Sequence, residues 1–86
     1  YTSWRDEQRA WKQSVAFYNQ AYHMISSIIR GKDAKALVQS LAVNNLEKFG
    51  PGKARHYLAC GHDGNVVGDG ILFGHAEDEI ELVGRA

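Results

Sequence analysis

The sequence predicts an α+β fold with the element order α-β-α-β-β-β and a mainly antiparallel sheet. Two segments with apolar residues at helical spacing precede Phe49-Gly50-Pro51-Gly52, the strongest break in the chain, and strand-like patterns follow it. An Asp63-Gly64 pair between two of the later segments is typical of a β-hairpin turn. Strands joined by short turns pair antiparallel, and we expect the helices to cover one face of the resulting sheet.

The first helix is expected over residues 4–18. Ser3 is a favourable N-cap, and Asp6 and Glu7 place negative charge in the first turn, where the helix dipole favours it. The apolar residues that follow are spaced by seven, four and three positions, which puts them on one helical face: Trp4, Trp11, Val15 and Tyr18. We interpret the Trp4 and Trp11 stripe as a docking face.

A strand over residues 22–30 and a second helix over roughly 33–43 come next. The strand is rich in Ile and ends at Gly31, and Asp33 then offers an N-cap for the helix. The apolar residues of this helix recur on one face, which predicts that they pack against the sheet: Ala34, Leu37, Val38 and Leu41.

Three strands are expected after the break, over residues 54–60, 65–73 and 79–85. The turn at residues 61–64 joins the first two, and residues 74–78 are expected to turn the chain before the third. His62 and His75 fall in these turns, so we expect both imidazoles to be exposed to solvent.

Composition excludes several classes of protein. The 86 residues carry ten Lys and Arg against ten Asp and Glu, so the broad basic field of a nonspecific nucleic-acid binder is absent. Cys60 is the single cysteine, which excludes an internal disulfide and a cysteine-based zinc site. The four His lack metal-ligand spacing, and no apolar run could span a membrane. We expect a cytoplasmic protein with no metal and no nucleic-acid or membrane partner.

Three residues could carry chemistry. His23 begins an otherwise apolar strand, where it either serves a site or is a structural His bonded to a backbone carbonyl. Asp69 lies between Gly68 and Gly70 inside an apolar strand, which indicates a bulge or the close approach of a ligand. Arg85 ends the last strand and suits bidentate binding of a carboxylate, the alternative being a surface Arg. The residues alone therefore predict an α+β unit with a cleft at these three positions.

An ordered set of sequence segments favours a functional role for these three residues over the structural alternatives. They are Asp6-Glu7-Gln8-Arg9-Ala10-Trp11, residues 18–24 (Tyr-Asn-Gln-Ala-Tyr-His-Met), Gly31-Lys32-Asp33-Ala34, Gly52-Lys53-Ala54, residues 63–73 and Leu82-Val83-Gly84-Arg85-Ala86. Together they resemble the aminomethyltransferase (glycine-cleavage T-protein) superfamily, and most of all its tetrahydrofolate-dependent O-demethylases of vanillate, syringate and other methoxy-aromatic acids. The resemblance runs over nearly the whole chain and implies a stretch near the N-terminus of a larger folate-binding domain.

The resemblance implies roles for six residues. Asp69 and His23 would be catalytic, and Arg85, with His23, would bind the carboxylate-bearing substrate. Gly68 stands where glycine-cleavage members have a first acidic residue, and Arg85 where they have a small one; both departures favour the demethylases. The folate would contact Met24, Asp69, His56 and Ile71, although glycine-cleavage members commonly carry Tyr at position 56.

The implied reaction moves a methyl group from a methoxy-benzoate to tetrahydrofolate. The implied partners are these two small molecules, in a parent enzyme several hundred residues long; the 86 residues alone are expected to be inactive. Two other hypotheses stay open. One is a non-catalytic module that self-associates through exposed sheet edges. The other is a different branch of the superfamily, such as a glycine-cleavage aminomethyltransferase.

Overall fold

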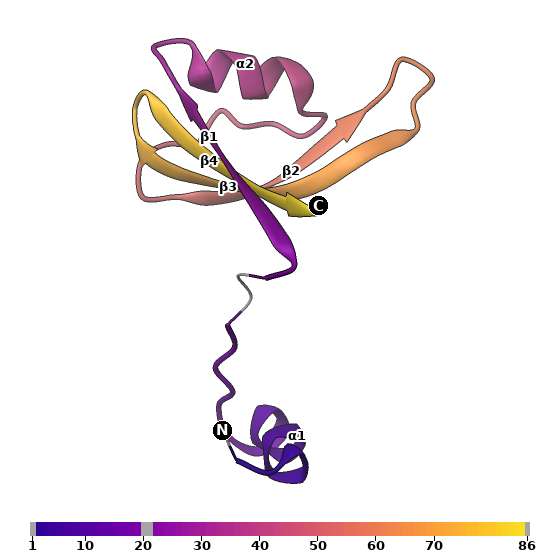
Figure 1. The fold of residues 1–86 in the computed structure, drawn as a ribbon. Helices are drawn as coiled ribbons and strands as arrows, with labels where there is room; N and C mark the ends of the chain where they lie inside the picture. The colour runs from indigo at the N-terminus through magenta and orange to yellow at the C-terminus, as the bar shows by residue number, and fades with distance from the viewer. Residues whose placement is uncertain (1, 20–21, 86) are drawn as a thin grey trace.

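The computed structural model describes residues 2–19 and 22–85 and has the predicted α+β order. The elements are α1 (Trp4–Gln13), β1 (Met24–Arg30), α2 (Ala34–Leu41), β2 (Ala54–Cys60), β3 (Val66–Ala76) and β4 (Glu79–Arg85). The four strands form one antiparallel sheet in the order β1-β4-β3-β2 (Figure 1). Strands β2, β3 and β4 are the predicted meander, and β1 joins its far side.

The core lies between the sheet and α2. Six residues are buried there, contributed by α2, the loop that follows it, and the two central strands: Ala34, Val38, Leu46, Phe49, Leu72 and Ile80. Leu46 and Leu72 are fully buried. Helix α2 covers one face of the sheet, and no helix or strand of the described residues covers the other face (Figure 1).

Helix α1 is shorter than predicted and does not cover the sheet. It ends at Gln13, where the Ser14 hydroxyl and backbone N–H both donate to the Ala10 carbonyl. A serine hydroxyl that bonds back to the helix competes with the next helical turn, and the β-branched Val15 follows it. Residues 15–19 have no regular secondary structure, so the prediction of a helix to residue 18 was wrong. Figure 1 shows α1 apart from the sheet. Trp4 and Trp11 are each more than half exposed.

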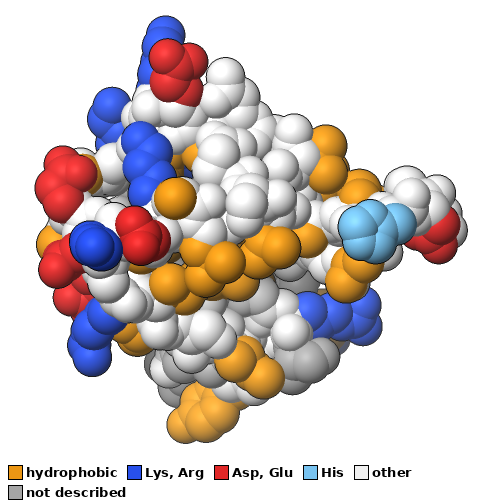
Figure 2. Space-filling model, turned by 90° about the horizontal axis from the view of Figure 1, so that it is seen from above, with side chains coloured by type: hydrophobic (Ala, Val, Ile, Leu, Met, Phe, Trp, Pro, Cys, Tyr) orange, Lys and Arg blue, Asp and Glu red, His pale blue; other side chains and the backbone are white. Residues whose placement is uncertain are grey.

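The buried face of helix α2 is narrower than the spacing of its apolar residues predicted. Ala34 and Val38, four residues apart, are buried, whereas Leu37 and Leu41 are about half exposed. Asp33 precedes the helix but makes no capping hydrogen bond through its side chain. A short helix that meets the sheet along one line of contact buries one ridge of side chains and leaves the neighbouring ridge uncovered. Seen from the α2 side, hydrophobic side chains form a band across the surface, and more of the charged side chains lie to the left of it than to the right (Figure 2).

The hairpins also differ from prediction at their ends. Strand β3 continues past Phe73 to Ala76, and the turn to β4 consists of residues 77 and 78. His75 is therefore a strand residue, and the expectation that it lies in a turn was wrong. The turn at residues 61–64 forms as predicted, with Gly64 at a φ of 83°. Strand β1 begins at Met24, so His23 precedes the strand. No helix among the described residues is long and apolar enough to cross a bilayer.

Candidate functional site

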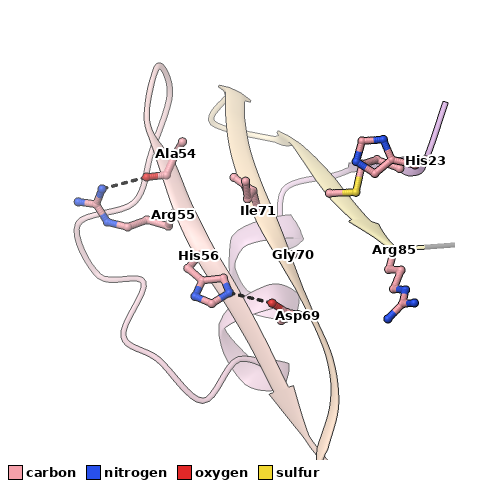
Figure 3. A pocket seen from close by; sticks show the side chains of 9 residues that line it. His23, Ala54, Arg55, His56, Asp69, Gly70, Ile71 and Arg85 are labelled. Atoms are coloured by element: carbon pink, nitrogen blue, oxygen red, sulfur yellow. Dashed lines mark hydrogen bonds and ion pairs between the residues drawn. The ribbon is translucent and has the colours of Figure 1, made fainter. Parts of the chain in front are cut away.

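A hollow of about 840 Å³ opens on the sheet face that α2 leaves uncovered. Its walls are the start of β1 and the end of β4 on one side, and β2 and β3 on the other (Figure 3). Its volume is in the range of small-molecule sites. The lining residues are His23, Met24, Ala54, Arg55, His56, Asp69, Gly70, Ile71 and Arg85.

The Arg85 guanidinium and the His23 imidazole lie on one wall of the hollow. The antiparallel register pairs Met24 with Arg85, which brings the end of β4 beside the start of β1, and His23 precedes that pair by one residue. His23 and Arg85 are both exposed. Within residues 2–19 and 22–85, no carboxylate forms an ion pair with the Arg85 guanidinium. A guanidinium fork of this kind can bind a carboxylate through two parallel hydrogen bonds.

The opposite wall carries a hydrogen-bonded pair. The His56 Nε2 atom on β2 lies 3.3 Å from Asp69 Oδ2 on β3, and about two thirds of each side chain is exposed (Figure 3). Asp69 is paired in register with Leu58, so His56 reaches it diagonally across the strands. The neighbouring Arg55 does not join this pair, because its guanidinium donates to the Ala54 carbonyl at 3.0 Å.

The two walls also contribute apolar lining, here called the floor, which is formed by Ile71, Met24 and Gly70. Residues 68–70 pair regularly with residues 57–59, and the register shifts between Ala59 and Cys60 instead. The irregularity falls at Val67 of β3, directly before Gly68, so the expected bulge adjoins the Gly68-Asp69-Gly70 triplet but lies outside it. A Cβ atom on Gly70 would lie 2.5 Å from the Val83 carbonyl oxygen, so the close neighbour of this glycine is the β4 backbone.

All six residues singled out in the sequence line this one hollow. His23, Met24 and Arg85 lie on one side, and His56, Asp69 and Ile71 on the other. The sequence pattern did not single out Ala54 and Arg55. Arg55 adjoins His56 on a strand, where alternation places neighbours on opposite faces, so periodicity offered no signal for it.

A second polar cluster on the uncovered face was also missed. Glu81 on β4 accepts a hydrogen bond from the Ser26 hydroxyl of β1 and lies 2.6 Å from His75 Nε2 of β3. The bond from Ser26, and secondarily that from His75, lowers the pKa of the Glu81 carboxyl. The cluster joins three adjacent strands and lies outside the hollow. The sequence did not indicate this cluster, because His75 was expected in a turn and not on a strand beside Glu81.

The described residues contain no group of three His, Cys, Asp or Glu side chains that could hold a metal ion. The charged or titratable side chains that line the hollow are two guanidinium groups, one of them bonded to the Ala54 carbonyl, two imidazoles and one carboxylate. Such a set can hold an anion at one end and a hydrogen-bond donor at the other, across an apolar floor.

Comparison with known proteins relates the whole chain to one family. The profile of the GCVT N-terminal domain matches residues 1–86. The chain is 44% identical to a syringate O-demethylase from a Sphingobium species over 86 residues, all of this chain and 19% of that protein. It is 34% identical to aminomethyltransferases from Mycobacterium avium and Mycobacterium tuberculosis over the same residues, 23% of each of those proteins. The chain thus spans about a fifth of the length of these relatives.

The profile match over all 86 residues agrees with the ordered segments of the sequence, so the chain belongs to the GCVT N-terminal domain family.

Proposed function

We propose that this chain supplies part of the substrate and cofactor site of a tetrahydrofolate-dependent O-demethylase acting on a methoxy-benzoate. The observation that carries the proposal is the Arg85 guanidinium, which has no ion-pair partner among the described residues. It lies beside His23 and faces the His56–Asp69 pair across an apolar floor. The identity of 44% to a syringate O-demethylase, against 34% to the aminomethyltransferases, favours this branch.

The side chains of the hollow suit the two ligands. The Arg85 fork would hold the benzoate carboxylate by two parallel hydrogen bonds. The aromatic ring would lie over the apolar floor, and a planar pterin ring suits the same surface. Asp69 would accept a hydrogen bond from a ring N–H of the folate. The residues present therefore fit both an anionic aromatic acid and a reduced pterin.

The reaction needs a proton at the ether oxygen and a fixed line of attack. When bound, tetrahydrofolate supplies the N5 nitrogen that takes the methyl group. The ether oxygen would give up its methyl group to that acceptor and gain a proton, which the acceptor nitrogen would release, so the exchange would balance. His23 would hold or donate the proton at the ether oxygen, and Arg85 would keep the ring in line. The products are a catechol-type acid and methyl-tetrahydrofolate.

The test uses the full-length protein that carries this segment, titrated with vanillate or syringate while methyl-tetrahydrofolate formation is followed. Arg85→Lys should weaken substrate binding by about 1–3 kcal/mol, because Lys keeps the charge but loses the planar fork. Asp69→Asn should instead lower turnover or folate affinity. Arg30→Lys is the matched control, since Arg30 pairs with Glu79 outside the hollow. Unchanged affinity for a methoxy-benzoate in Arg85→Lys would show that the aromatic-acid assignment is wrong.

A second candidate function, self-association, rests on the edges of the sheet. At the β2 edge, Ala42 bridges Ala59 and the Val43 N–H donates to the Leu58 carbonyl at 2.8 Å. At the β1 edge, no backbone hydrogen bond from another described segment reaches the strand. This strand, MISSIIR, has no charge before Arg30 and no Pro, so it lacks the usual devices that block edge pairing.

We propose that β1 of a second copy would add to this edge in antiparallel fashion. Pairing centred on Ser27 would set Ile25 opposite Ile29 of the partner copy and would keep the two faces of the sheet continuous. Light scattering of the 86-residue chain should then give a dimer that Ser27→Lys dissociates, while Gln8→Lys, on exposed α1, leaves it intact. A clean monomer at micromolar concentration would exclude this function.

A further inference from the structure

The backbone carbonyl of His56 is held by a side chain from a segment outside the sheet. The Asn44 side chain, in the segment after α2, donates from Nδ2 to the His56 carbonyl at 2.7 Å. The same side chain accepts from the Leu58 N–H at 3.3 Å through Oδ1. One amide thus bridges two alternate residues of β2, and His56 projects from a strand that is fixed on its outer side.

The contact between His56 and Asp69 uses only one carboxylate oxygen. Nε2 of His56 meets Oδ2 of Asp69, and among the described residues no hydrogen bond reaches Oδ1. An ionised carboxylate only accepts hydrogen bonds, so the free oxygen can take an N–H or O–H from a ligand. The other charged or titratable side chains that line the hollow are Arg55, which is bonded to the Ala54 carbonyl, and His23 and Arg85 on the opposite wall.

We propose that His56 is a positioning residue for Asp69: it holds Oδ2 so that Oδ1 can accept a hydrogen bond from a ring N–H of the bound folate. This inference rests on the proposed function and assigns His56 a role distinct from packing against the pterin. A side chain held at one oxygen loses less rotamer freedom when a ligand binds at the other, which favours binding. Asn44 holds the β2 backbone at His56, and the His56 side chain in turn holds the Asp69 carboxylate.

The experiment measures tetrahydrofolate affinity, KM and kcat in the full-length protein. His56→Phe keeps a ring but removes Nε2, and His56→Gln restores an amide donor. Because the pair is largely exposed, we expect His56→Phe to weaken tetrahydrofolate binding about threefold to fivefold. We expect His56→Gln to recover most of that loss and KM for folate to change more than kcat. The thermal unfolding midpoint should stay the same, and His62→Phe, in the exposed turn, should bind like the unaltered protein.

A double-mutant cycle decides whether His56 acts through Asp69. In an Asp69→Asn background, His56→Phe should cause no further loss of affinity. Equal losses in the two backgrounds would overturn the inference, since His56 would then act on the ligand directly by packing. If the unaltered protein and the His56→Phe variant bind tetrahydrofolate equally well, the inference fails and the proposed function stands. Absence of tetrahydrofolate binding by the unaltered protein would refute both.

Discussion

The two glycines that flank Asp69 should respond in opposite ways to the same added methyl group. Gly68 and Gly70 lie in one strand, and neither has a positive φ, so the local backbone conformation does not require glycine at either position. Around Gly68 nothing lies within 4 Å of a built Cβ. At Gly70 the same atom would lie 2.5 Å from the Val83 carbonyl oxygen and 3.2 Å from Leu82 Cδ1. Because the nearer atom belongs to the backbone, no side-chain rotation relieves the clash.

The size of the effect follows from these contacts. Gly68→Ala should stabilise the fold by about 0.4–1 kcal/mol, because it restricts the unfolded chain at no steric cost. Gly70→Ala should destabilise it by about 1–3 kcal/mol, the usual cost of overpacking, because β3 and β4 must move apart. A folded domain of this length has a total stability of about 4–13 kcal/mol, so the second change removes a large fraction of it.

Urea unfolding followed by far-ultraviolet circular dichroism is the suitable assay. Trp fluorescence is unsuitable because Trp4 and Trp11 lie on α1, apart from the sheet. In thermal unfolding each kcal/mol corresponds to about 4–8 °C for a domain of this size. Equal stability of Gly68→Ala and Gly70→Ala would refute the reasoning, since the approach of the β4 backbone would then not be what requires glycine at position 70.

Three further predictions concern stability and exposure. Hydrogen bonds from the β1 serine and the β3 histidine lower the pKa of Glu81, so the ionised carboxylate stabilises the fold at pH values above the ordinary carboxyl pKa. This contribution is lost as the pH falls through the lowered pKa. Glu81→Gln should therefore flatten the curve of unfolding free energy against pH in this range. An unchanged curve would contradict the prediction. Leu72→Ala should cost about 2–5 kcal/mol in urea unfolding, because Leu72 is fully buried, whereas Ile71→Ala, on the uncovered face, should cost clearly less; similar losses would argue against the assigned core. Trp4 and Trp11 are 64% and 62% exposed, so iodide should quench both efficiently, and shielded emission would mean that α1 is packed against another surface.

Much of the fold follows from local signals in the sequence. Strands β2 and β4 have the predicted bounds, because turn residues mark their ends and the apolar residues between them favour extended chain. The Asp63 side chain accepts from the Asn65 N–H at 3.1 Å, and this bond stabilises the turn that the Asp-Gly pair indicated. Asp63 also has a lowered pKa, chiefly because of that bond. Such features depend on neighbours in the chain and can be recognised without the rest of the fold.

The candidate site was reached by a different route. The unusual positions of His23, Asp69 and Arg85 pointed to a cleft, and the resemblance to a family added Met24, His56 and Ile71. The roles of these six residues remain proposals. The contact between His56 and Asp69 was not foreseen, since it depends on the register of β2 against β3, which pairs His56 with Ile71 and so brings it diagonally to Asp69.

The sequence by itself determined the fold class, the order of the elements and the family, because these depend on hydrophobic spacing, turn residues and an ordered set of segments. Only the tertiary structure decided where α1 ends, which ridge of α2 is buried and that β1 joins the sheet beside β4. It also decided that Glu81 meets both Ser26 and His75, residues from strands on either side of it. The physical reason is that a side chain's burial and partners are set by the strand beside it in space. For β1 that neighbour is β4, the last strand of the described chain.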